Sequence, residues 1–488
     1  MTKKILLLSL CASTSLFAQS ELEELKALLA QQMKTTQALQ KRVVQLEKKQ
    51  TRQTKETKKQ AREVQQAKKQ IAVVQNTQEA TPTVQAAGTF DQKSFLPDIS
   101  LILDTSYVSR SEKDEALKHL EIPGIAHGIM GEHSHGDGHS HAPLNAHDGF
   151  NLNYAEVAMQ SNVDPYLSLT GIFHLSEDNF EIEEAYGETT GLGYGLKAKI
   201  GKFRSDFGRI NSQHQHVQDF SDMPLVYTAF LGGHGIDDIG AQIQWTLPTD
   251  TYIMAGFEAL QGKNPTMYGT DAIAPEGDEE TIVVDSPNQP NLLIAYLKSS
   301  FDIDNTTFLY GASVAYGESR LNHLTDEEPH AFVAKSYLYG ADLTIKHYFD
   351  SYSYLTFQGE YLYRDMDGDT YTYTDASKTS FNSTPTTKEQ GGYYAQLVYA
   401  LDRNYRFGLR YDNINTNDIT KNGLSLTTED NFDRYTAMID YTPSEFTRFR
   451  LQYNQNNAMF NEEGERQHID SLILEMNLAI GAHGAHTF

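Results

Sequence analysis

From Leu96 onward the chain is a succession of segments of about ten residues in which apolar and polar side chains alternate. A period of two places successive side chains on opposite faces of a β-strand. In the segment pair at 393–412, one parity carries Tyr393, Ala395, Leu397, Tyr399, Tyr405, Phe407, Leu409 and Tyr411. The other parity carries Gln396, Arg406, Arg410 and Asp412. Strands with one apolar and one charged face fit a sheet that separates lipid from water.

Sixteen such segments can be counted, and they are separated alternately by short turns and long polar loops. They lie near 99–109, 150–161, 166–176, 181–190, 196–206, 240–247, 251–261, 291–300, 306–317, 337–347, 353–364, 391–400, 404–413, 432–441, 447–456 and 468–480. An even number of strands returns both barrel ends to the same side of the membrane. We therefore predict an all-β fold, a sixteen-stranded antiparallel transmembrane β-barrel over residues 96–488, or an eighteen-stranded one if a hairpin is missed.

Composition excludes several other classes of protein. The mean hydropathy is -0.50, and no apolar run outside the first 20 residues approaches the ~20 residues of a membrane-spanning helix. The net charge of -25 argues against a nucleic-acid partner, which requires a basic face. A single cysteine excludes a disulfide framework and a cysteine-based zinc site. Since no serine-nucleophile or phosphate-binding motif is present, we expect no enzyme activity and no obligatory cofactor.

The first 95 residues differ in character from the rest. Residues 1–18 have the basic start, apolar run and small final residue of a signal peptide. Residues 21–75 keep an a/d heptad register without Gly or Pro, which predicts a periplasmic coiled coil; a single solvated helix or a disordered basic tail is the alternative. Residues 76–95 resemble a linker. Residues 21–70 hold 13 basic and 6 acidic side chains, so a basic stalk precedes an acidic barrel.

The barrel segment resembles known outer-membrane proteins. The stretches SFLPDISLILDTSYVSR (94–110) and FEIEEAYGETTGLGYGLKAKIGKFRSDFGRIN (180–211), in the order stalk, linker and barrel, are similar to sixteen-stranded porins of the phosphate-selective type. The His-rich first loop and the GAHGAHTF end are closer still to porin-like proteins sometimes labelled zinc-regulated outer-membrane receptors. The resemblance covers about residues 96–488 and implies a passive diffusion channel in the outer membrane.

The third long loop, 207–238, falls where porins fold a loop into the barrel, and the resemblance therefore implies a constriction there. The loop offers Asp219, Asp222, Asp237 and Asp238. The predicted lumen face of the late strands carries Arg364, Arg406, Arg410, Arg434, Arg448 and Arg450. Acids opposite arginines would create a transverse field in the pore. Alternatively, the acids are solvated and the arginines pair with Glu360, Asp412, Asp440 and Glu475.

Histidines are concentrated in the first long loop. Residues 127–147 contain His127, His133, His135, His139, His141 and His147, and His214 and His216 add a pair on the third loop. Neutral imidazoles on a Gly- and Ser-rich segment can converge on zinc, copper or nickel. A solvated polar loop that binds metal only incidentally is the alternative.

These features predict a trimeric porin that contacts outer-membrane lipid, passes small ions or solutes and captures divalent metal at a His-rich mouth. Two alternatives stay open. One is a protein that tethers the outer membrane to the cell wall through the coiled coil, with the barrel as anchor. The other is an anion-selective, phosphate-type porin, because the acidic barrel favours cations whereas the arginines favour anions.

Overall fold

The computed structural model describes residues 97–126, 144–177, 179–264, 266–274, 283–324, 329–374 and 380–481. These residues belong to one compact unit, Asp91–Phe488. The predicted signal peptide (1–18), coiled coil (21–75) and linker (76–95) lie outside them, as does most of the His-rich loop. Within the described ranges, no helix combines the length and the apolar character needed to cross a membrane.

The described residues form mainly β-strands. The strands are β1 (Asp98–Arg110), β2 (Gly149–Asn162), β3 (Leu167–Leu175), β4 (Phe180–Thr189), β5 (Leu196–Arg204), β6 (Asp237–Thr246), β7 (Tyr252–Leu260), β8 (Leu292–Ile303), β9 (Thr306–His323), β10 (His330–Tyr348), β11 (Tyr354–Tyr373), β12 (Phe381–Ala400), β13 (Tyr405–Lys421), β14 (Leu424–Ser425), β15 (Phe432–Ser444), β16 (Thr447–Phe460) and β17 (Arg466–Gly481). The short helices are α2 (Asp114–Leu117), the 3-10 turn η2 (Gln215–Val217) and α3 (Leu225–Leu231).

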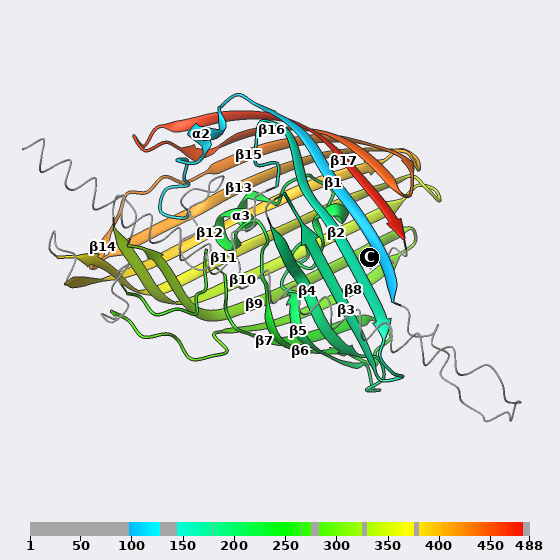
Figure 1. The fold of residues 1–488 in the computed structure, drawn as a ribbon, viewed down its shortest axis with the longest axis horizontal. Coiled ribbons are helices and arrows are strands. Elements are labelled where there is room, and N and C mark those ends of the chain that lie inside the picture. The colour runs from blue at the N-terminus through cyan, green and yellow to red at the C-terminus, as the bar shows by residue number, and fades with distance from the viewer. Residues whose placement is uncertain are drawn as a thin grey trace, which may run out of the picture. The chain divides into compact units, whose positions relative to one another are not determined.

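The strands close into a barrel of sixteen antiparallel strands (Figure 1). Each long strand pairs with its neighbours in sequence, and β1 closes the ring by pairing with both β2 and β17. The two-residue β14 pairs with the end of β13 and is part of a loop, since β13 also pairs directly with β15. The predicted barrel and its strand number are therefore confirmed.

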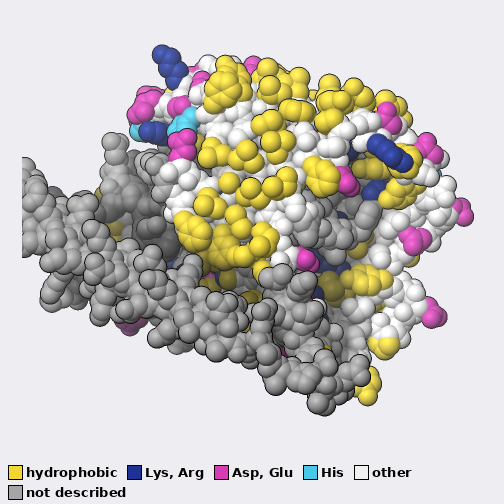
Figure 2. Space-filling view, turned by 45° about the vertical axis from the view of Figure 1, so that its right-hand side comes forward, with side chains coloured by type: hydrophobic (Ala, Val, Ile, Leu, Met, Phe, Trp, Pro, Cys, Tyr) yellow, Lys and Arg dark blue, Asp and Glu magenta, His cyan; other side chains and the backbone are white. Residues whose placement is uncertain are grey.

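The two faces of the wall differ as the alternation predicts. On β13, Leu409 points outward with 63% of its surface exposed, whereas its neighbour Arg410 points inward with 2% exposed. Figure 2 shows apolar side chains spread over the visible barrel surface. Tyr393, Tyr411 and Tyr435 form a row of contacting rings on that outer surface. A closed barrel with an apolar exterior and interfacial tyrosines is the outer-membrane architecture, and this domain lies in the outer membrane.

Strand length varies around the barrel. The strands β3, β5 and β7 have 9 residues each, which is about what a tilted strand needs to cross a bilayer. The strands β9 to β13 have 17 to 20 residues and continue past the ends predicted from the sequence. The extra residues lie at the side opposite the short turns, which is the extracellular side in this architecture.

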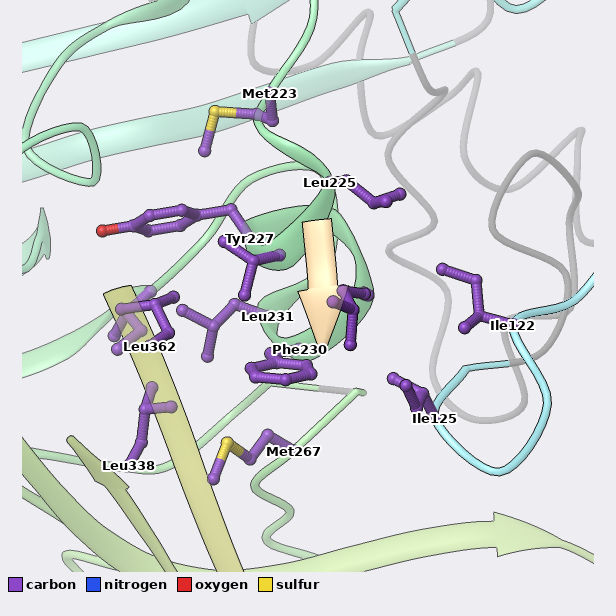
Figure 3. Close-up of a cluster of buried hydrophobic side chains, with 14 of the residues drawn as sticks. Ile122, Ile125, Met223, Leu225, Tyr227, Phe230, Leu231, Met267, Leu338 and Leu362 are labelled. Atoms are coloured by element: carbon purple, nitrogen blue, oxygen red, sulfur yellow. The ribbon is translucent and has the colours of Figure 1, made fainter. Parts of the chain in front are cut away.

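The loop after β5 folds into the barrel and packs there (Figure 3). Its helix α3 contacts β12 and β13. Tyr227, Phe230 and Leu231 of α3 are buried with Leu338 of β10 and Leu362 of β11. The same cluster takes in residues of the loops after β1 and β7, among them Ile122, Ile125 and Met267. An apolar cluster inside the barrel thus narrows the lumen.

Candidate functional site

One buried carboxylate on the wall holds the root of the inward loop. Glu360 of β11 accepts hydrogen bonds from the backbone N–H groups of Arg209 and Ile210, each at 2.8 Å. It also accepts bonds from the hydroxyls of Tyr227, at 2.8 Å, and Tyr394, at 2.6 Å. Hydrogen bonds to a charged acceptor are the stronger kind, so Glu360 fixes both the start of the loop and its helix.

Asp222 attaches the middle of the loop to the basic side of the wall. Its carboxylate lies 2.7 Å from Arg410 Nη2 and 3.0 Å from Arg434 Nη1. The side-chain amide of Gln452 donates a further bond at 2.8 Å. Burial alone would raise the pKa of Asp222, but the two guanidinium groups outweigh it and lower the pKa below its usual value. The backbone N–H of Leu225 donates to Asp412, which extends the same network.

The other predicted arginines are also paired, or packed. Arg406 contacts Asp219 at 2.9 Å and Asp440 at 2.5 Å. Arg450 makes a two-point contact with Asp440, at 2.7 and 3.0 Å. Arg448 lies 2.8 Å from Glu475. By contrast, Arg364 donates to Gln390 and to the Ile125 carbonyl, and its guanidinium stacks on the ring of Phe230 at 4.3 Å.

These ion pairs balance in charge. Five arginines are involved, namely Arg406, Arg410, Arg434, Arg448 and Arg450, and five acids face them, namely Asp219, Asp222, Asp412, Asp440 and Glu475. The sequence suggested an acidic loop separated from a basic wall by the pore. In the structure the loop acids Asp219 and Asp222 contact the wall arginines directly. The wall acids Asp412, Asp440 and Glu475 pair with the same arginines, as the alternative interpretation proposed. The electric fields of these opposite charges therefore largely cancel.

Asp237 and Asp238 are the first residues of β6 rather than part of the free loop. Asp237 lies 3.1 Å from Lys202 Nζ on β5. Asp238 accepts hydrogen bonds from the backbone N–H groups of Gly262 and Lys263, at 2.5 and 3.0 Å. The ladder between β5 and β6 begins at these residues because Asp237 pairs with Arg204. Both carboxylates therefore attach the wall to neighbouring segments.

A second cluster of charged side chains lies on β2, β3, β4 and the inward loop and contains histidines. It consists of Glu156 on β2, His174 on β3, Glu183 and Glu184 on β4, and His214 and His216 on the inward loop. Glu183 and Glu184 are consecutive, yet both are buried. The register between β3 and β4 shifts there, since Ile172 pairs with Glu184 and Phe173 with Ile182. This bulge turns two successive carboxylates into the lumen.

The contacts within this His–Glu cluster are short. His174 Nε2 lies 3.1 Å from Glu156 Oε2 and also contacts Glu183. His214 Nε2 lies 3.1 Å from Glu184 Oε2, and its Nδ1 lies 3.7 Å from both Glu156 Oε2 and Glu183 Oε1. His216 Nδ1 lies 3.4 Å from Glu156 Oε2. Burial alone would lower the pKa of His214, but Glu183 and Glu184 raise it well above its usual value.

The predicted metal ligands are thus divided by the structure. His214 and His216 come together, with ring centroids 5.7 Å apart, beside carboxylates that the sequence reasoning did not select. His147 lies at the outer end of the barrel, 3.5 Å from Asp114. His127, His133, His135, His139 and His141 lie outside the described residues.

Comparison with known proteins identifies a relative. No protein-family model matches the chain. An "Uncharacterized protein" of Aquifex aeolicus (strain VF5) is 48% identical over 400 residues, which is 82% of this chain and 81% of that protein. The two chains belong to one family. Because the two proteins share nearly half of their aligned residues, the Aquifex protein offers a second sequence in which the sites described above can be tested.

Solved structures with similar folds are bacterial outer-membrane proteins. The anion-selective porin from Comamonas acidovorans is 10% identical, with 79% of this chain and 99% of that chain covered and a TM-score of 0.46. The outer membrane channel DcaP of Acinetobacter baumannii is 12% identical, with 81% and 100% covered and a TM-score of 0.45. Identities this low transfer no substrate to the family.

Proposed function

We propose that the protein is a porin, a passive diffusion channel of the outer membrane, and that it prefers cations. The observation that supports this proposal is the charged loop folded into a closed barrel, held there by Glu360 and Asp222. A loop fixed inside a barrel narrows the lumen. The side chains that line the remaining passage then determine which solutes pass. An interior built only to anchor a stalk would not require this arrangement.

The preference for cations follows from the balance of charges. Five of the six arginines that suggested an anion channel are matched one for one by acids, and the sixth, Arg364, packs against Phe230. The His–Glu cluster has three carboxylates, offset by Arg204, 2.5 Å from Glu183, and by His214, whose pKa the carboxylates raise. The barrel segment as a whole is acidic, and a net negative channel attracts cations and repels anions. A phosphate-type porin would require unpaired arginines facing the path.

Reversal potential in a planar bilayer tests this proposal. The full-length protein, inserted under a tenfold KCl gradient, should conduct and should show a reversal potential of the sign given by potassium permeation. A reversal potential of the opposite sign would support the anion-selective alternative. Membranes that stay non-conducting after confirmed insertion of folded protein would contradict the channel itself and favour an anchor.

We also propose that the His-rich loop captures divalent metal ions at the channel mouth. The support is its composition, because six histidines within residues 127–147 provide many imidazole ligands. Deleting residues 127–143 should leave a folded, conducting barrel and remove most zinc binding measured by calorimetry. Unchanged binding would exclude the capture role. Trimer formation and cell-wall attachment through residues 21–75 stay predictions.

A further inference from the structure

We propose that the His–Glu cluster inside the barrel is a binding site for one divalent transition-metal ion of the zinc type. Its central ligands are Glu156, Glu183 and His214, with His216 and His174 beside them. Its ligands are different residues from the histidines of the 127–147 segment. It stands whether or not the channel prefers cations, because the proposal concerns binding rather than permeation.

The donor atoms are already close together. One ligand atom each from Glu156, Glu183 and His214 lie within 4.8 Å of one another. Ligands held at about 2.0–2.2 Å from one zinc ion lie up to about 4 Å apart, so small side-chain rotations would close the site. Glu156 and Glu183 are almost fully buried, at 3% and 2% exposure. His214 Nδ1 points into the cluster and has no hydrogen-bond partner among the described residues.

The charge of the cluster favours a divalent cation. Glu156, Glu183 and Glu184 supply three carboxylates, and Arg204 Nε and Nη2 donate to Glu183 at 2.9 and 2.5 Å. With the imidazoles neutral, as metal ligation requires, two negative charges would remain in this buried cluster. Buried charges in proteins are either paired or bound to metal. An ion of charge +2 would balance the cluster, and mixed imidazole and carboxylate donors suit zinc and its neighbours.

The local structure brings these donor side chains together. The β4 bulge turns both Glu183 and Glu184 inward, where a regular strand would present one of them to lipid. His214 and His216 flank the start of η2 on the inward loop, whereas the carboxylates are on the wall. An ion bound here would therefore join the loop to β2 and β4. It would hold the loop at His214, shortly before Asp222.

The competing explanation needs no metal. Two protonated imidazoles would also neutralise the excess charge, and the His–Glu contacts would then be ordinary ion pairs. The two explanations differ in a measurable way, because only a metal site takes up an ion with a defined stoichiometry and with imidazole in its coordination shell.

Zinc binding to the full-length barrel in detergent tests the proposal. The starting variant replaces His127, His133, His135, His139 and His141 by Asn, which removes the external loop's imidazoles. Calorimetry should show about one strong Zn²⁺ site per chain. His214→Gln and Glu156→Gln should each weaken it at least tenfold, since even the loss of a supporting contact costs about that much. His468→Gln is the matched control, because this exposed histidine pairs with Asp470 on β17 and with none of the cluster residues in the described contacts.

Each outcome decides the question. No Zn²⁺ uptake by the starting variant would overturn the proposal and leave protonated histidines as the explanation. Equal binding in the His214→Gln, Glu156→Gln and His468→Gln proteins would place the ion elsewhere and overturn it too. If the cluster variants do not fold, zinc-edge X-ray absorption of the starting variant still decides. Imidazole and oxygen ligands support the site, and a shell without imidazole refutes it.

Discussion

The hydroxyl of Tyr227 donates a hydrogen bond of 2.8 Å to Glu360, which lies 133 positions later in the chain. This bond joins the helix of the inward loop to the middle of the wall. Tyr227→Phe should lower the free energy of unfolding in urea by about 1.5–3 kcal/mol, because it removes a buried bond to a charged acceptor. Tyr363→Phe removes a similar bond, to Glu389, at an exposed site and should have little effect. Equal losses would show that Glu360 is not an anchor.

Asp222→Asn should both destabilise the barrel and change its selectivity. Arg410 and Arg434 would keep their charges without the carboxylate that faces them, and breaking such a buried pair costs about 3–5 kcal/mol. The reversal potential should move toward anion permeation, because positive charge is uncovered beside the loop. A variant that unfolds at the wild-type urea concentration with unchanged reversal potential would contradict the proposed network.

The low pKa of Asp222 sets the pH range of this attachment. A carboxylate whose folded pKa is depressed stabilises the fold above its unfolded pKa of about 3.9, and this contribution is lost as the pH falls through the lower folded value. The difference in unfolding free energy between wild type and Asp222→Asn should therefore stay constant from pH 7 to about pH 5. It should shrink below about pH 4. A difference that disappears near pH 6 would rule out this assignment.

Shortening the inward loop should widen the channel. Replacing residues 215–233 by a short Gly–Ser linker removes α3 and its apolar contacts with Leu338 and Leu362. Single-channel conductance should rise several-fold, while the strands stay paired. An unchanged conductance from an inserted, folded variant would mean that ions do not pass beside this loop.

Gly256 on β7 makes room for a tyrosine of the next strand. It lies directly opposite Tyr296 of β8, and a Cβ atom added at Gly256 would be 2.0 Å from that ring. Gly256→Ala should therefore cost about 1–3 kcal/mol of stability by overpacking. Gly233→Ala is the control, because nothing lies within 4 Å of its added Cβ. If the two substitutions are equally tolerated, Tyr296 can move without cost.

The alternation of apolar and polar residues was sufficient to predict the barrel, but not the extracellular extensions of its strands. Apolar residues on the lipid face define where a strand crosses the membrane. β11 continues from Arg364 to Tyr373 after that signal ends, because the sequence there, DMDGDTYTY, pairs through its backbone with no lipid to face. The predicted end near residue 364 marks the end of the apolar outward face rather than the end of the strand.

The candidate sites were only partly predictable. The inward loop and its two histidines could be chosen from the sequence. The residues that they contact could not, because those residues lie on other strands or far along the chain: Arg209, for example, donates to Glu360, 151 positions later. One local signal was present. Phe180 and Ile182 set the outward parity of β4, and Glu184 has that same parity, which in a lipid-facing strand is costly. The break in parity indicates the bulge.

The unequal strands give the barrel an uneven rim. The β9 to β13 side stands about ten residues higher than β3, β5 and β7, or about 30 Å of strand. The His–Glu cluster lies on the low side, within a few residues of the outer ends of β3 and β4. The extracellular rim is therefore high over β9 to β13, and the His–Glu cluster lies close to its low part.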